Sequence, residues 1–327
     1  MRTEFIFEGA PFAQCHASTI AETPDGLVAA WFGGTREGAS DVAIWTSRCD
    51  DDGWRQPDCV AVGTEGRRRY PCWNPVLFQP SSGPLHLYYK VGPSPSRWWG
   101  MQMASADHGR SWSAPIRLGH GILGPIKNKP VELASGHWLS PSSCERSGWK
   151  IHVERTTDHG STWHREHALN DGRSFAAIQP CVLRHREGRL QLLSRTRQGT
   201  IASCWSDDGH HWSPLAPTTL PNPDSGIDAV TTADGTHVLI YNHAQSARSP
   251  LNLAASDDGI HWSALWVLEA DPGEYSYPAI IQGTDGRLHL TWTWNRRRIR
   301  YASLRMEELA PVAIDSGHWP DPPGAST

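Results

Sequence analysis

Turn signals and strand-like runs alternate along the whole chain. Six turns centred on glycine each precede a run rich in apolar, β-branched or aromatic residues, such as LVAAWF after Gly26 and LHLTWTW after Gly286. Short apolar runs of this kind, several of them alternating with polar residues and bounded by turn residues, predict antiparallel strands. The turn glycines are 47–57 residues apart: Gly26, Gly83, Gly136, Gly188, Gly235 and Gly286. Helical periodicity is confined to the stretch around 306–309.

A second pattern, D-x-G-x-x-W, repeats between these strands. It occurs at Asp107-Gly109-Trp112, Asp158-Gly160-Trp163, Asp207-Gly209-Trp212 and Asp257-Gly259-Trp262, with a shortened version at 50–54. The four tryptophans are 51, 49 and 50 residues apart. In such a sequence the Asp accepts backbone N–H bonds and the Gly takes a positive φ, so a tight turn is predicted, with the Trp packing it onto the sheet.

The two repeats together predict the architecture. Six units of about 50 residues, each with about four short strands, are typical of an all-β, six-bladed β-propeller. The sixth unit lacks the D-x-G-x-x-W turn, so we expect the Glu4–Phe7 segment to supply its last strand and close the ring. The prediction is one domain over residues 1–310 and a C-terminal tail over 311–327, which is rich in Pro and Gly.

Composition excludes several classes of protein. The formal net charge is −4, which argues against a protein that coats nucleic acid. No run of 18 apolar residues is present, so no membrane-spanning helix is expected. The count of 17 tryptophans indicates a repeated structural unit, a carbohydrate-facing surface, or both.

The cysteines and the N-terminus bear on location and cofactors. Seven cysteines without a C-x-x-C pair predict reduced thiols, and the first eight residues lack the apolar run of a signal peptide, so a cytoplasmic location is expected. Neither H-E-x-x-H nor a glycine-rich phosphate loop occurs, so we expect no metal and no cofactor.

Candidate chemistry is sought where the inner strands of a propeller converge at its central mouth. Arg195 ends an apolar strand, where a guanidinium is costly to place unless it meets an anion, and Arg197 lies two residues further on the same strand face. A lysine pair on a proline-braced loop suits an anion, although an exposed loop is the alternative. Aromatic residues beside polar ones suit a sugar. The further predicted substrate-binding residues are Trp73, Asn74, Lys127, Lys129, His243 and Tyr277.

The D-x-G-x-x-W repeat is the Asp-box, or BNR repeat, and the chain resembles the sialidase superfamily over about 300 residues. The resemblance implies a propeller of sialidase type and a set of catalytic positions. His16 lies where sialidases have the first arginine of a carboxylate clamp, while Arg195 and Arg248 match the second and third. Gln179 lies where many sialidases have the glutamate that activates the nucleophile.

The resemblance also implies the reacting groups. The GGTRE loop resembles the loop that carries the acid/base carboxylate, which makes Glu37 the candidate acid and Asp41 its rival, with Arg36 beside them as a substrate contact. The Tyr-Ser pair at 275–276 resembles the segment with the nucleophilic tyrosine, which assigns that role to Tyr275. The alternative for Tyr275 is a packed strand aromatic, and for His16 a hydrogen-bonded core histidine.

Three functions are compatible with these residues. The first is a sialidase-like exo-glycosidase, in which Arg195 and Arg248 hold the carboxylate of a terminal acidic sugar. The second is a uronate lyase that cleaves by β-elimination with His16 and Tyr275, similar to propeller enzymes that act on rhamnosyl-glucuronate ends. The third is a propeller that binds glycans without catalysis. The expected partner is an acidic oligosaccharide; neither nucleic acid nor membrane is expected, and the sequence does not determine the oligomeric state.

Overall fold

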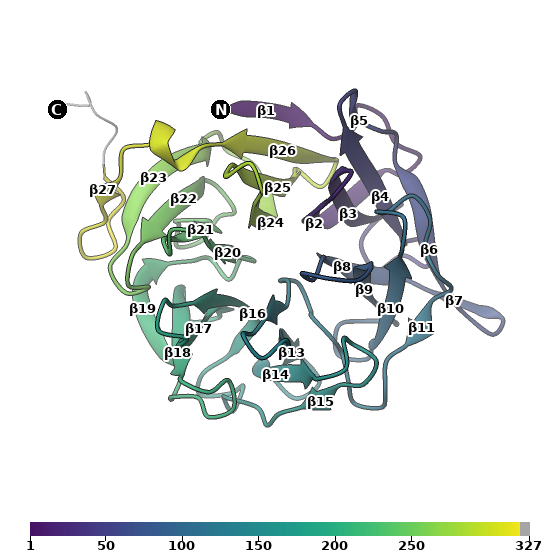
Figure 1. Ribbon diagram of the computed structural model, residues 1–327, viewed down its shortest axis with the longest axis horizontal. Coiled ribbons are helices and arrows are strands. Elements are labelled where there is room, and N and C mark those ends of the chain that lie inside the picture. Colours follow the sequence, from purple (N-terminus) through teal and green to yellow (C-terminus); the bar gives the residue numbers. More distant parts are fainter. Residues whose placement is uncertain (321–327) are drawn as a thin grey trace.

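Six antiparallel sheets surround a central axis, as predicted (Figure 1). The computed structural model describes residues 1–320. Blade one contains β2 (Gln14–Thr23), β3 (Gly26–Gly34), β4 (Ala43–Asp50), β5 (Gly53–Trp54), β6 (Asp58–Glu65) and β7 (Arg68–Tyr70). Blade two contains β8 (Cys72–Phe78), β9 (Leu85–Val91), β10 (Trp99–Ser105) and β11 (Ile116–Arg117). Blade three contains β12 (Val131–Glu132), β13 (Trp138–Cys144), β14 (Lys150–Thr156) and β15 (His164–Arg165).

The remaining blades follow the same order from the axis outward. Blade four contains β16 (Ala177–Arg184), β17 (Leu190–Thr196), β18 (Thr200–Ser206) and β19 (Ala216–Pro221). Blade five contains β20 (Asp228–Thr231), β21 (His237–Tyr241), β22 (Leu251–Ser256), β23 (Ser263–Glu269) and β27 (Val312–Ala313). Blade six contains β24 (Tyr275–Gln282), β25 (Leu288–Trp294), β26 (Arg298–Leu304) and β1 (Arg2–Phe5). A short 3-10 helix, η1 (Met306–Glu308), occupies the stretch where helical periodicity was noted. No helix among residues 1–320 has the length and apolar character needed to span a membrane.

The first strand of the chain completes the last blade. β1 pairs with β26 in an antiparallel register that aligns Arg2 with Ser303 and Phe5 with Arg300. This confirms the predicted ring closure, with the strand beginning two residues earlier than Glu4.

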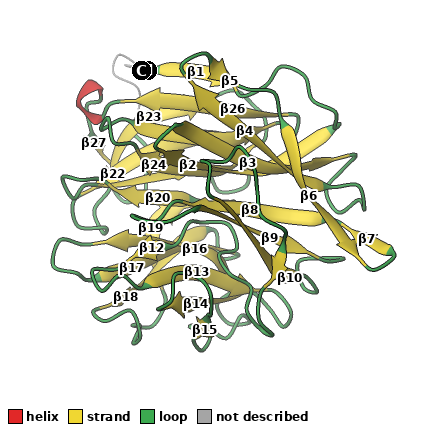
Figure 2. Cartoon of the chain, turned by 45° about the vertical axis from the view of Figure 1, so that its right-hand side comes forward, coloured by secondary structure: helices red, strands yellow, loops and turns green. Residues whose placement is uncertain are grey.

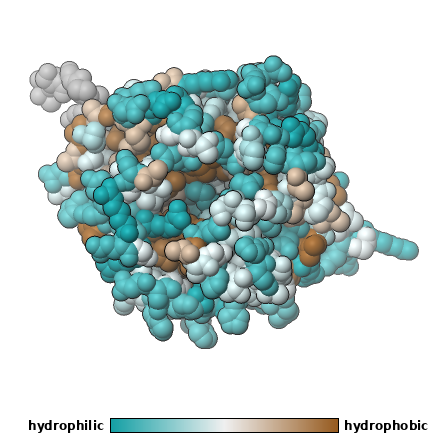
Figure 3. Space-filling model, viewed as in Figure 1, coloured by the Kyte–Doolittle hydropathy of each residue, from teal (hydrophilic) through white to brown (hydrophobic). Residues whose placement is uncertain are grey.

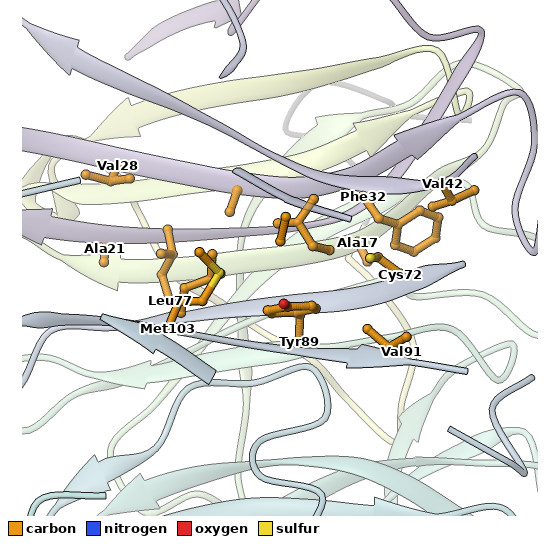
Figure 4. Close-up of a cluster of buried hydrophobic side chains, with 14 of the residues drawn as sticks. Ala17, Ala21, Val28, Phe32, Val42, Cys72, Leu77, Tyr89, Val91 and Met103 are labelled. Atoms are coloured by element: carbon orange, nitrogen blue, oxygen red, sulfur yellow. The ribbon is translucent and has the colours of Figure 1, made fainter. Parts of the chain in front are cut away.

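Apolar side chains fill the spaces between neighbouring blades. Between blades one and two, for example, Val28 and Phe32 from β3 pack in one cluster with Leu77 from β8 and Tyr89 from β9 (Figure 4). The Asp-box turns join these cores: Gly109 has φ +85°, and a Cβ at that position would lie 3.1 Å from the Val28 side chain of the preceding blade. Glycine is therefore required there by backbone conformation and by close approach.

The turns are held by a carboxylate, but not always by the predicted one. Asp107 and Asp158 accept the backbone N–H of the residue four positions later, at 2.8 Å in both cases. In the third and fourth boxes the acceptor is the next residue, Asp208 or Asp258, each of which accepts two backbone N–H groups. The role predicted for Asp207 and Asp257 is thus taken by their neighbours, because the double Asp allows the turn to be capped from either position.

A buried ionic cluster fixes the connection between blades two and three. The Glu154 carboxylate accepts the backbone N–H groups of Leu123 at 2.9 Å and Gly124 at 2.6 Å, and His152 Nε2 lies 3.1 Å from it. Lys90 donates to the carbonyl of Pro125, and the side chains of Lys90, His152 and Glu154 are fully buried. The cluster determines where the following residues, 126–130, reach the axis.

The described part of the predicted tail packs on blade five. β27 pairs with β23, and His243 lies 2.9 Å from the carbonyl oxygen of Gly317 through Nε2. Trp319 contacts Tyr241 and His243. Residues 311–320 therefore extend the propeller, while residues 321–327 lie outside the described residues.

Candidate active site

Four inner strands share a backbone irregularity at the axis. Ala17, Asn74, Gln179 and Tyr277 have φ of 58°, 34°, 55° and 50°, and each lies where the register between the first and second strands of its blade shifts. A bulge of this kind redirects a side chain relative to strict alternation, and strained backbone of this type gathers at functional sites. The four bulges define one end of the axis, which we call the site face of the disc.

Tyr277 lies at the centre of this arrangement. Its hydroxyl oxygen accepts hydrogen bonds from Arg195 Nη2 at 3.0 Å and from Gln179 Nε2 at 3.2 Å. The guanidinium of Arg248 lies 5.9 Å from the ring centroid, and the ring of His16 lies 4.3 Å away. Blades one, four, five and six therefore each contribute to the surroundings of one phenol group.

His16 is buried beside Tyr277 as a neutral group. Its Nδ1 lies 3.1 Å from the Thr293 hydroxyl, which also accepts the backbone N–H of Ala17. Burial, followed by the positive charges of Arg296 and Arg248, lowers the pKa of His16 well below its usual value. The imidazole is therefore uncharged at neutral pH, which favours a packing and hydrogen-bonding role over one as proton donor.

Arg195 is held between two aromatic rings. Its guanidinium carbon is 4.9 Å from the Trp149 ring centroid and 5.4 Å from that of Tyr277, and Nη1 donates to the Asp224 carbonyl. Arg197, which is exposed, covers the same indole at 4.3 Å. Such stacking orients the guanidinium beside the phenol, and the Asp224 carboxylate lies 3.6 Å from Nη1 on its other side.

A second group of charges centres on Glu274, which sequence analysis did not single out. Its carboxylate accepts hydrogen bonds from Arg248 at 3.0 Å and from Arg296 Nε at 2.9 Å, and Arg296 also pairs with Glu37. Burial alone would raise the pKa of Glu274, but the hydrogen bond and charge of Arg296, together with Arg248, lower it. Arg296 reaches this network from a turn in which its φ is 55°. The only sign of this turn in the sequence is the preceding Asn295.

A tight hollow, too narrow for a water-sized sphere, lies beside this cluster. It is lined by Gln14, His16, Phe32, Arg36, Glu37 and Arg296. The face of the disc drawn in Figure 3 is hollowed around its centre, where hydrophilic and hydrophobic residues both border the opening. Of the two predicted acids, Glu37 lines the hollow, whereas Asp41 does not.

Tyr275 is not part of this cluster. Its ring belongs to the apolar core between blades five and six, which also contains Val238 and Leu253 of blade five and Ile280 and Leu290 of blade six. Strict alternation would place Tyr275 and Tyr277 on the same strand face, but the bulge after Ser276 sends their rings in different directions. The predicted convergence of Tyr275 with His16, Arg195 and Arg248 is therefore wrong, and Tyr277 occupies that position.

Several other residues predicted to bind substrate make structural contacts within the protein. Asp41 accepts the backbone N–H and the hydroxyl of Thr35 at 2.8 and 2.6 Å, so it caps its own loop. Trp73 donates from Nε1 to the Gly92 carbonyl at 2.8 Å and lies beneath the loop at Gly38, next to the buried Asn74. His243 contacts residues 317–319 instead of the axis.

The two lysines that were predicted to bind an anion instead contact oxygen atoms of the protein. Lys127 donates to the carbonyls of Ile227, at 2.8 Å, and Pro278, while Lys129 pairs with Asp228 at 2.9 Å. Lys127 is 3% exposed and joins blades three, five and six below the site. Its charge contributes to the positive field at the axis, but its ammonium group is already satisfied.

The buried lysines give stability a pH dependence. Burial lowers the pKa of Lys127 to about 8 and that of Lys90 to about 7, below the ordinary value of 10.5 that applies to the unfolded chain. Between pH 7 and 8 the unfolded chain therefore binds more protons than the folded one, and the free energy of unfolding should rise with pH. Each lysine contributes a slope of at most about 1.4 kcal/mol per pH unit.

Urea unfolding at several pH values between 7 and 8 measures this slope. Lys127→Met should reduce it, whatever its effect on stability at any one pH. A slope that is flat or negative in the unsubstituted protein would contradict the prediction. The range stops at pH 8 because burial raises the pKa values of the Cys72 and Cys204 thiols from 9 to about 12, so that above pH 8 the unfolded chain loses thiol protons that the folded protein keeps, which is the opposite trend.

Metal binding is not indicated by the described residues. Among residues 1–320, no three His, Cys, Asp or Glu side chains are grouped so that they could hold a metal ion. The side chains that meet at the axis are a phenol, a neutral imidazole, a carboxylate and several guanidinium groups.

Comparison with known proteins identifies the family of the chain. Residues 25–290 match the family described as BNR repeat-like domain. A sialidase from Micromonospora viridifaciens is 27% identical over 255 residues, covering 73% of this chain and 35% of that protein, so the chain spans about a third of the length of this relative.

Solved structures show the same fold at low identity. The NanB sialidase of Streptococcus pneumoniae has a TM-score of 0.76 at 13% identity, covering 94% of this chain and 71% of that one. The intramolecular trans-sialidase of Ruminococcus gnavus, in complex with oseltamivir carboxylate, has a TM-score of 0.75 at 12% identity, covering 94% and 98%. A Dyadobacter fermentans protein of unknown function has a TM-score of 0.77 at 15% identity, covering 93% and 97%.

Proposed function

Because the chain belongs to the BNR repeat-like family of the sialidase superfamily, we propose that it is an enzyme that cleaves the glycosidic bond of an acidic sugar at the propeller axis. The observation that supports this most is the environment of Tyr277, whose oxygen accepts hydrogen bonds from Arg195 and Gln179. N–H donors aimed at the phenol oxygen stabilise the negative charge that develops there when its proton leaves. The tyrosine is thus prepared to act as a nucleophile or a base.

The charged groups around the phenol indicate an acidic substrate. Arg195 and Arg248 approach Tyr277 from two blades, and guanidinium groups bind carboxylates in a fixed geometry. We assign the substrate carboxylate to these two arginines, which places the anomeric carbon of the same sugar near Tyr277. Arg248 is itself held by Glu274, which orients it for this task.

Membership of the sialidase superfamily favours hydrolysis as the reaction. Tyr277, as the phenolate, attacks the anomeric carbon, the bond to the leaving oxygen breaks, and Glu37 gives that oxygen a proton; sialidases are known to use a tyrosine in this way. Water then attacks the same carbon, the bond to Tyr277 breaks and restores the phenolate, and Glu37 takes a proton from the water. To begin this sequence Glu37 must leave Arg296 and be protonated.

Two features favour β-elimination as a second candidate. The group hydrogen-bonded to Tyr277 is the neutral Gln179 and not a carboxylate, and Glu37 is paired with Arg296. In elimination Tyr277, without its proton, removes the C5 proton of a uronate while Arg195 and Arg248 stabilise the charge on the carboxylate. The C4–O bond then breaks, the leaving oxygen takes the proton from Tyr277, and a double bond forms between C4 and C5 of the sugar.

The products distinguish these reactions. Incubation with a panel of sialosides and glucuronosides, followed by mass spectrometry, should show release of the acidic sugar as the free hydrolysed product. A product lighter by one water, with ultraviolet absorption from the new double bond, would replace hydrolysis by elimination. Tight binding of these glycans without any product would overturn the enzymatic proposal.

His16→Ala tests the part played by the neutral imidazole. Because His16 packs on the Tyr277 ring and is not in the protonated imidazolium form that acts as an acid, we expect KM to rise about tenfold with kcat nearly unchanged, which is the mark of lost uniform binding. Thr293→Val is the matched control, since it removes the hydrogen bond to His16 and keeps the ring. A fall in kcat of about 10²–10⁴-fold at constant KM would instead identify His16 as the acid or base of an elimination.

A further inference from the structure

An arginine recurs at one position in all six blades. The loop between the second and third strands contains at least one arginine in each blade: Arg36, Arg97, Arg146, Arg197, Arg248, and the pair Arg296 and Arg297. The recurrence is not part of the Asp-box repeat, which lies between the third and fourth strands. It is therefore a separate sixfold feature of the chain.

These loops lie on the site face. Neighbouring strands of a blade run in opposite directions, so the end of the second strand meets the start of the first, where the bulges and the axial residues are. Arg248 and Arg296, which belong to the site, come from two of the loops. The six loops thus surround the axial opening.

The outer members of the set are available to a ligand. Arg36, Arg97, Arg146, Arg197 and Arg297 are exposed, and none of them forms an ion pair within residues 1–320. We call these five residues the arginine ring. The acidic residues in the six loops are Glu37, Asp41 and Glu145, of which Glu37 is paired with Arg296 and Asp41 is hydrogen-bonded to Thr35.

The opposite face is richer in acidic residues. Its Asp-box turns carry Asp107, Asp158, Asp207, Asp208, Asp257 and Asp258, beside Arg110. Its hairpins between the first and second strands add Asp25, Glu187, Asp234 and Asp285, beside Arg186, Arg189 and Arg287. The connections between blades place Asp171, Asp224, Asp271 and Glu274 on the site face as well, so with a net charge of −4 for the whole chain the arginine loops reflect an uneven distribution of charge between the two faces.

A hairpin extends the positive surface outward from blade one. β6 continues past its pairing with β4 and turns back as β7, so that the hairpin projects from the rim (Figure 2). Its arginines, Arg67, Arg68 and Arg69, are exposed, and Arg69 donates to the Asp41 carbonyl at 3.0 Å. The Tyr70–Trp99 contact and the Arg117–Glu65 ion pair hold its base on blade two.

We propose that the site face binds a polyanionic glycan, with the sugar to be cleaved at the axis and the acidic groups of further sugars on the arginine ring and the hairpin. The proposal rests on the proposed function, and it adds that the substrate is a chain of several acidic sugars instead of one acidic sugar on a neutral glycan. Guanidinium groups spaced around an opening match carboxylates repeated along a polymer. A positive face also attracts such a chain from a distance and speeds encounter.

Binding of polygalacturonate, a polymer of uronate sugars, tests the proposal without requiring turnover. Biolayer interferometry should show binding that weakens as NaCl is raised from about 0.05 to 0.5 M, because salt screens exposed charges. The triple variant Arg97→Gln, Arg146→Gln and Arg297→Gln should bind about tenfold more weakly, since each exposed contact contributes only a fraction of a kcal/mol. Dextran, which is neutral, should not bind.

The matched control removes the same charge from the opposite face. Arg110→Gln, Arg186→Gln and Arg189→Gln together should change the affinity less than twofold. Equal losses in the two triple variants, no loss in the ring variant, or tighter binding of a DNA duplex than of polygalacturonate would each overturn the proposal. Should the ring variant unfold more easily than the control, the hairpin variant Arg67→Gln, Arg68→Gln and Arg69→Gln provides the same test.

A small substrate separates this proposal from the proposed function. The ring variant should cleave a single-carboxylate aryl glycoside at the rate of the unsubstituted protein, because none of its three arginines lines the axial hollow. Loss of polymer binding with intact cleavage supports both proposals. Polymer binding through the ring without cleavage of any acidic glycoside refutes the proposed function alone.

Discussion

Tyr277→Phe is expected to abolish cleavage of an acidic glycoside, with kcat falling by about 10³–10⁶-fold, the range seen when a nucleophile or its partner is removed. The substitution deletes one oxygen, the one that accepts hydrogen bonds from Arg195 and Gln179, and leaves the ring that packs against His16. Substrate affinity should change little, because Arg195 and Arg248 still hold the carboxylate. Single-turnover kinetics with an aryl glycoside and an independent binding measurement separate the two quantities.

Tyr275→Phe is the control that the fold itself provides. It removes the same atom from a tyrosine two residues away, whose ring packs between blades five and six. We expect kcat to stay within a few-fold of the unsubstituted protein. The reverse result, a large loss from Tyr275→Phe and none from Tyr277→Phe, would mean that the axial arrangement is not the catalytic one.

Glu154→Ala is expected to cost about 3–5 kcal/mol of unfolding free energy, the typical penalty for removing one partner of a buried ionic group. The substitution leaves the N–H groups of Leu123 and Gly124 without an acceptor and removes the negative charge near the buried ammonium of Lys90. Both consequences act on the connection between blades two and three. Urea unfolding followed by tryptophan fluorescence measures the change.

Glu166→Ala is the control that separates the effect of burial at Glu154 from the effect of removing a negative charge. Glu166 pairs with Arg155 at 3.3 Å, but its side chain is 25% exposed, so its removal should cost less than about 1 kcal/mol. Similar losses from the two substitutions would show that the Glu154 cluster contributes no more than a surface ion pair.

The fold could be predicted because short stretches of sequence specify its turns and strands. Each Asp-box specifies its own turn through two or three neighbouring residues, and the spacing of about 50 residues repeats the result around the ring. Even the double Asp at 207–208, where the capping residue was misassigned, leaves the turn unchanged. The strand runs follow from short apolar patterns that do not depend on distant partners.

The site could be predicted only in part, because it depends on departures from regular structure. The bulge at Tyr277 breaks the alternation on which the choice between Tyr275 and Tyr277 rested. A proline follows the bulged residue at Asn74, Gln179 and Tyr277, and proline inside a strand run indicates a bulge or an edge, so this signal was available. No comparable signal exists for Glu274 and Arg296, whose pairing with Glu37 joins segments that are far apart in the sequence.

Closure of the ring by β1 has a consequence for how the protein is made. The chain is synthesised from its N-terminus, so residues 2–5 leave the ribosome before the rest of the propeller and then wait for β26, which ends at Leu304. Domains in general fold during synthesis as their residues emerge, but the sixth blade cannot be completed until β26 has also emerged. During that interval β1 has no pairing partner, and unpaired strands are where chains aggregate. Slow translation of the last blade, or a lack of chaperones at that stage, should therefore reduce the yield of folded protein more than the same delay in an earlier blade.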